Sequence, residues 1–202
     1  MAQVFSGRMG IALLCILLVC AACASSPPSR FYQLGSLKAG NQPATGGAPR
    51  QLITVAVALV QIPDYLDRPQ IVTSSGGNEL RLAEFDRWAG SLDDDINRAL
   101  AEDLSALLPA DRFLVTTRAA GPAALPQYRV EVNIIRFEGA PGKSVLLKAR
   151  WTIFNRDRAL SLHRESIISR KVRGDTYEAL VTAMSDSLAA LGGDIAGAIL
   201  SF

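Results

Sequence analysis

The stretch YRVEVNIIRFEGAPGKSVLLKARWTIFNRDRALSLHRESIISRKV, residues 128–172, decides the fold. Apolar and polar side chains alternate along three runs within it, 128–137, 144–154 and 162–172. Such alternation is typical of strands with one buried face, and the short turns between the runs predict antiparallel hairpins. In the first run the phase of the alternation changes at residues 134–135, which predicts a β-bulge.

The middle run predicts which face of this sheet is buried. Its alternating side chains are apolar Val145, Leu147, Ala149, Trp151 and Ile153 on one face and Ser144, Lys148, Arg150 and Thr152 on the other. We expect the first set to pack on helices and the second set to meet water or a partner.

Shorter strands are predicted upstream. Residues 52–62 form a nearly continuous Val-rich run that Pro63 ends, which is typical of a central or doubly covered strand. Residues 69–73 and 79–83 flank the turn sequence Ser-Ser-Gly-Gly-Asn and predict a hairpin. Residues 31–34 predict a first short strand.

Two amphipathic helices are predicted from apolar residues at helical spacing. The first begins at Ser91, which we expect to form a capping box with Asp94, and it ends at Pro109. The second begins at Asp175. The glycines at 192–193 predict fraying or a bend in it, because each glycine costs about 1 kcal/mol relative to alanine.

The element order of strands, helix, strands and helix predicts the fold class α+β. We expect a mostly antiparallel β-sheet backed by two amphipathic helices, a two-layer sandwich. The chain has 202 residues and is 49% hydrophobic, which suffices for one sizeable core and not for two. Residues 31–202 are therefore predicted to form a single domain.

The N-terminus has the pattern of a cleaved secretory signal. Arg8 precedes an apolar run that is shorter than a membrane-spanning helix and is followed by polar residues. The run ends in Cys-Ala-Ala-Cys, which resembles a bacterial lipobox and predicts removal of residues 1–22 and lipidation of Cys23. The alternative is an ordinary secretory signal cut near Ala22.

The residues after Cys23 predict the location of the mature protein. Ala24 rather than Asp follows the acceptor cysteine, which by the same resemblance directs the protein to the outer membrane, facing the periplasm. Residues 23–30 form the lipidated tether, in which the residues from Ala24 to Arg30 span at most about 25 Å. The folded body must therefore lie close to its membrane, and a partner in the opposite membrane has to reach it.

Composition and motifs argue against several classes of function. Lys and Arg number 21 against 19 Asp and Glu, with no long run of one sign, which argues against a nucleic-acid binder. All cysteines lie in the first 23 residues and His163 is the only histidine, which leaves no metal site or thiol nucleophile in the mature chain. Serine-hydrolase and nucleotide-binding loop motifs are absent from the sequence. Helix capping accounts for the acids at 93–95. We predict no enzyme, no cofactor and no metal.

Residues 63–92 carry a resemblance to a known family. They contain Tyr-Leu-Asp-Arg-Pro-Gln-Ile-Val at 65–72 and Arg-Trp-Ala at 87–89, and Phe-Tyr-Gln-Leu follows shortly after Cys23. The chain resembles the auxiliary lipoproteins of ABC-type transport systems, the PqiC or YmbA type, over essentially its whole mature length. It departs from the family pattern at residues 90–91, where an acidic residue and a proline are expected.

The resemblance implies a noncatalytic outer-membrane lipoprotein that faces the periplasm. Such a protein works with a substrate-binding MCE-domain protein and the inner-membrane permease of an ABC transporter, moving lipids or other hydrophobic compounds between membranes. The rival hypothesis is a structural or assembly lipoprotein of the envelope without a transport role. A third hypothesis is a lipid-binding cavity within this protein itself.

Six residues of the same region are candidates for a surface that docks the partner or another copy of this chain, because aromatic and arginine side chains are enriched at interfaces. They are Tyr65, Arg68, Gln70, Glu84, Arg87 and Trp88. The alternative assigns them structural roles, with the Arg87 guanidinium stacked on the Trp88 indole and Tyr65 in the core. The sequence leaves both interpretations open.

Overall fold

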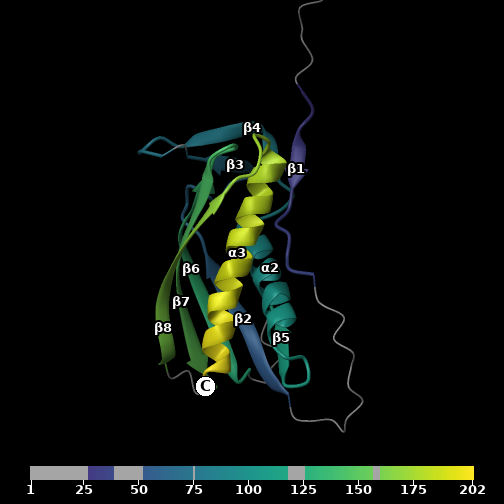
Figure 1. Cartoon of the computed structure of the whole chain (residues 1–202), viewed down its shortest axis with the longest axis vertical. Helices are drawn as coiled ribbons and strands as arrows, with labels where there is room; N and C mark the ends of the chain where they lie inside the picture. The colour runs from purple at the N-terminus through teal and green to yellow at the C-terminus, as the bar shows by residue number, and fades with distance from the viewer. Residues whose placement is uncertain (1–26, 39–51, 75, 118–125, 157–159) are drawn as a thin grey trace, which may run out of the picture.

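The structure, a computed structural model, describes residues 27–38, 52–74, 76–117, 126–156 and 160–202. These residues form one eight-stranded sheet with two helices packed on one of its faces (Figure 1). The predicted α+β class with two layers is confirmed. The predicted signal at 1–22 and the lipidated Cys23 lie outside the described residues.

The three alternating runs form the long antiparallel part of the sheet. They are β6 (Tyr128–Gly139), β7 (Ser144–Asn155) and β8 (Leu160–Lys171), and β7 pairs with both of the others. The register of β6 against β7 shifts between Ile134 and Arg136, so the predicted bulge is present.

The burial of β7 follows the predicted alternation. The residues that point toward the helices, at most 1% exposed, are Val145, Leu147, Ala149, Trp151 and Ile153. The polar set on the opposite face is half-buried or exposed. The sheet therefore has one face covered by helices and one open face.

The remaining strands make the sheet mixed rather than antiparallel throughout. They are β1 (Arg30–Tyr32), β2 (Ile53–Gln61), β3 (Gln70–Thr73), β4 (Arg81–Trp88) and β5 (Phe113–Thr116). β2 runs parallel to β5 and β6, and β1 runs parallel to β4, while β3 and β4 form the predicted antiparallel hairpin. The sequence analysis did not predict β5. It also did not predict the parallel pairs, because alternation identifies a strand but not the direction of its neighbour.

The first helix, α2 (Leu92–Leu107), lies where it was predicted, but its cap differs. Ser91 is the N-cap residue, yet its side chain makes no capping hydrogen bond. Its hydroxyl donates to the Asp93 carboxylate instead. The predicted capping box with Asp94 is therefore wrong, because the Ser91 hydroxyl is turned toward the Asp93 carboxylate and accepts no backbone N–H of the helix.

The second helix, α3 (Tyr177–Leu200), begins two residues later than predicted and is longer than its glycines suggested. Thr176 is the N-cap, and its hydroxyl accepts from the backbone N–H of Ala179 at 3.1 Å. The helix continues through Gly192 without fraying, because α2 packs directly against it there. A Cβ atom on Gly192 would lie 3.2 Å from the Cβ atom of Asp103 on α2.

Candidate docking surface and the attachment of the N-terminal segment

The first strand ties the start of the described chain to the sheet. β1 pairs with β4 so that Arg30 lies opposite Asp86. The buried Asp86 carboxylate accepts from the Tyr32 hydroxyl at 2.8 Å and pairs with Arg30 Nε at 2.9 Å. Burial and this hydrogen bond raise the pKa of Tyr32. The chain is thus attached to the folded body from Arg30 onward.

Residues 33–38, the strap, continue from β1 across the two helices. The backbone N–H of Leu34 donates to Asp95 Oδ2 at 2.7 Å, and its carbonyl accepts from Arg98 Nη2 at 2.6 Å. The N–H of Leu37 donates to Asp103 Oδ1 at 2.7 Å. These bonds fix the backbone of the strap to α2 at both ends.

Two further contacts hold the centre of the strap. The N–H of Gly35 donates to Ser185 Oγ on α3 at 2.9 Å. The Ser36 hydroxyl donates to Glu102 Oε2 at 2.5 Å and, with Arg98, holds the pKa of Glu102 below its usual range. The strap and its acceptors were not predicted from the sequence. No periodic signal identifies these contacts, since they join residues 61 to 150 positions apart.

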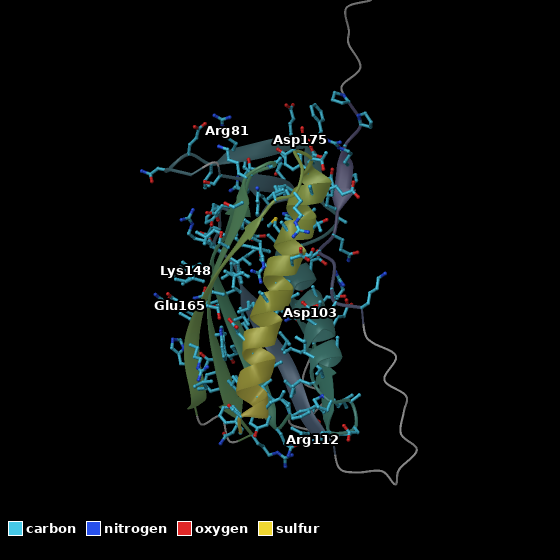
Figure 2. The ribbon with its side chains drawn as sticks, viewed as in Figure 1. Arg81, Asp103, Arg112, Lys148, Glu165 and Asp175 are labelled. Atoms are coloured by element: carbon cyan, nitrogen blue, oxygen red, sulfur yellow. The ribbon has the colours of Figure 1, made fainter. Side chains whose placement is uncertain are left out.

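Asp103 is the most deeply buried acid of this attachment. Its side chain is fully buried, and Oδ2 has no hydrogen-bond partner among the described residues. Burial raises the pKa of its carboxyl above the ordinary value, although the Leu37 N–H opposes this. Figure 2 shows it between the two helices, halfway along them.

Of the six predicted site residues, Tyr65 and Arg68 lie in the turn that joins β2 to β3. The Tyr65 hydroxyl donates to Glu138 Oε2 at 2.7 Å, and burial together with this bond raises the tyrosine pKa. Glu138 is itself buried and pairs with Arg136 at 2.6 Å. Tyr65 thereby fastens the turn to β6. Arg68 is half-buried, and its Nε atom has no partner in the described part of the chain.

The other four predicted residues lie on β3 and β4. Gln70 pairs with Arg87 in the sheet, and Arg87 Nε reaches the carbonyl oxygen of exposed Glu84 at 3.4 Å. Trp88 is only 5% exposed and belongs to the core. Neighbouring strand residues point to opposite faces, so Arg87 and Trp88 do not stack as the alternative interpretation supposed.

The structure therefore brings three of the six residues together on β3 and β4, with Arg68 in the turn just before β3. This β3–β4 surface comprises Arg68, Gln70, Glu84 and Arg87. It leaves Trp88 in the core and gives Tyr65 a structural partner.

Polar side chains on the open sheet face are paired with one another. The Glu165 carboxylate forms ion pairs with two cations of β7. Its Oε1 lies 3.2 Å from Lys148 Nζ, and its Oε2 lies 3.0 Å from Arg150 Nε (Figure 2). The single histidine, His163, shares a hydrogen bond of 2.9 Å with Thr152. The described residues hold no group of His, Cys, Asp and Glu suited to a metal ion. Nor does this part of the chain include a helix long and apolar enough to cross a membrane.

Two crystal structures share this arrangement of a sheet and two helices. One, of an uncharacterized protein, has a TM-score of 0.69 and 21% identity, covering 86% of this chain and 99% of that chain. The other, of a Xanthomonas campestris protein, has a TM-score of 0.62 and 16% identity, covering 85% of this chain and 95% of that chain. These likenesses show the fold.

Sequence comparison gives the family. The model of the ABC-type transport auxiliary lipoprotein component matches residues 32–196, and the chain belongs to this family. It is similar to the intermembrane transport lipoprotein PqiC of Escherichia coli K12 and of Shigella flexneri. Each is 26% identical over 172 residues, 82% of this chain and 83% of the relative. The resemblance seen in the sequence is confirmed, and the protein is a noncatalytic transport component rather than an enzyme.

Proposed function

We propose that the mature protein is lipidated at Cys23, sits in the outer membrane facing the periplasm, and docks the other components of an intermembrane transport system. The system moves lipids or other hydrophobic compounds. Its other components are an MCE-domain protein and an inner-membrane ABC permease. Membership of a transport auxiliary family supports the role, and the PqiC relatives carry intermembrane transport in their names.

The attachment of the strap is the observation that carries this proposal. The chain is bound to the body from Arg30 through Leu37, so only residues 24–29 separate Cys23 from the attached part of the chain. Such a tether reaches about 20 Å. A body held this close to its membrane cannot carry cargo across the periplasm. It can serve as a fixed docking point for a partner that spans the gap.

The β3–β4 surface is the proposed docking site. Arg87 has one long bond to a backbone carbonyl, and Arg68 has a buried Nε atom without a partner among the described residues. A guanidinium that lacks hydrogen-bond partners is stabilised when a binding partner supplies an acceptor. Arginine is also common among the residues that contribute most to binding at interfaces. Glu84, which is exposed on the same strand as Arg87, supplies the opposite charge.

Affinity capture from native membranes tests the proposal. The wild-type chain is compared with Cys23→Ala and Arg87→Ala, with Arg150→Ala on the open sheet face as the matched arginine control. We expect the wild type and Arg150→Ala to recover an MCE-domain protein and a permease. Arg87→Ala should recover less of both, and Cys23→Ala should leave the membrane.

Three results would overturn parts of this account. Recovery of envelope-assembly proteins alone would favour the rival structural role. Equal recovery with both arginine variants would remove the β3–β4 surface as the docking site, and recovery of only this chain would make that surface a contact between copies.

A further inference from the structure

Four exposed cations gather where the β6–β7 turn meets the end of β8. This basic tip consists of Lys143, Arg170, Lys171 and Arg173. The backbone holds them together: Lys171 pairs with Ser144, and the N–H of Val172 donates to the Lys143 carbonyl at 2.8 Å. The turn is closed by a second bond of 2.6 Å from Gly142 N–H to the Gly174 carbonyl.

The cations of the basic tip have no acid partner, whereas several other cations of the sheet are paired. Arg136 pairs with Glu138, and Lys148 and Arg150 pair with Glu165. Within the described ranges, the four cations of the tip make no ion pair with any acid. The loop that follows β8 adds one acid, Asp175, which is labelled in Figure 2. Four cations against one acid leave the tip with an excess of positive charge.

The tip lies at the same end of the molecule as Arg30, where the tether joins β1. Figure 1 shows β1, β4, the β6–β7 turn and the loop from β8 to α3 at one end, and the C-terminus at the other. We call these the β1 end and the C-terminal end. Phe31 beside the tether is 65% exposed, which adds a large apolar side chain to the β1 end. Since the tether is short, the β1 end must face the lipid surface.

We propose that the basic tip binds the anionic headgroups of the membrane that holds the lipid anchor, so that the domain stands on its β1 end. The inference rests on the proposed lipidation of Cys23. Cations attract an anionic lipid surface within about one Debye length, roughly 8 Å at physiological salt. Acyl chains and the tip together make two attachments, which fix the orientation of the body as well as its location. The C-terminal end then points into the periplasm.

A fluorophore at the tip measures this contact. The lipidated full chain carries Ser144→Cys for labelling, because Cys23 is blocked and the other cysteines leave with the signal. It is reconstituted in phosphatidylcholine vesicles with or without phosphatidylglycerol, both containing a brominated lipid as quencher. Ser105→Cys near the C-terminal end of α2 is the control position. Intact mass of the protein first establishes the acyl modification, so a failure of the proposed lipidation is detected separately.

We expect the label at residue 144 to be quenched in the anionic vesicles and much less in the neutral ones, and the label at 105 in neither. The double variant with Lys171→Gln and Arg173→Gln should bind the anionic vesicles through its tip more weakly. We expect the association constant of this contact to fall about fivefold for each cation removed. The matched pair Arg112→Gln with Arg156→Gln, which lies away from the tip, should leave it unchanged. Quenching at 144 that is equal in both vesicles, or that both double variants reduce alike, would overturn the proposal.

Discussion

The helix-covered core and the strap are held in place in different ways. Behind the helices, Trp88, Trp151 and Leu188 are buried in one continuous apolar core. Along the strap, individual backbone N–H groups donate to single acceptors such as Asp95 and Asp103. The core supplies most of the stability of the domain. The polar contacts decide where the anchor segment leaves it, and therefore how the domain sits on a membrane.

The largest expected difference separates two neighbours on β4. Trp88→Ala should lower the free energy of unfolding by about 3–5 kcal/mol, because it opens a cavity in the core. Arg87→Ala should change it by no more than about 0.5 kcal/mol, as for a surface side chain. Urea denaturation of both variants measures this contrast, and equal losses would show that the β3–β4 surface is structural.

A smaller loss is expected at the strap. Asp95→Ala removes the acceptor of the Leu34 N–H and a partner of Arg98, and should cost about 1.5–3 kcal/mol. Asp94→Ala one position earlier is the control, with a loss below about 1 kcal/mol from the helix dipole. Hydrogen exchange at the Leu34 amide should accelerate only in the first variant. Unchanged exchange there would mean that Asp95 does not hold the strap.

The glycine pair in α3 tests the packing between the helices. Gly193→Ala meets open space and should raise the free energy of unfolding by about 1 kcal/mol through helix propensity. Gly192→Ala places its methyl group 3.2 Å from the Cβ atom of Asp103, so it should gain less or lose stability. Thermal denaturation of the two variants compares them, and equal gains would show that the helices have room to separate.

The smallest effect concerns the pH dependence of Asp103. Its carboxyl has a raised pKa when folded, so the folded state binds the proton more tightly than the unfolded state. Stability therefore declines as pH rises from the ordinary value of 3.8 toward the folded pKa, and the loss persists at neutral pH. Asp103→Asn should flatten this decline and raise stability at neutral pH. A decline with pH that remains as steep in this variant would assign it to other groups.

Sequence patterns predicted the helix-covered face well, and the strand directions and the strap poorly. Alternation in 144–154 identified the buried side of β7, and the phase change at 134–135 identified the bulge. The same patterns could not show that β2 runs parallel to β6, since a strand's partner depends on the path of the whole chain. The strap was missed for a related reason, because its acceptors are single polar residues without periodicity.

The sequence predicted the candidate site only in part, because the packing of the whole chain decides which side chains are buried. The aromatic and arginine residues of 63–92 suggested an interface, but residue type does not distinguish a core side chain from an exposed one. Strand pairing separates them: Arg87 points outward beside Gln70, and Trp88 enters the core. The register of β3 against β4 was needed to separate the exposed residues of the predicted site from the buried ones.

Photo-crosslinking at residue 87 tests the central claim most directly. A benzophenone amino acid replaces Arg87 in one chain and Arg150 in another, and both are irradiated in native membranes. The account predicts a crosslink to an MCE-domain protein from position 87 and none from position 150. A crosslink from position 150 alone, or none to a transport component from either position, would contradict it.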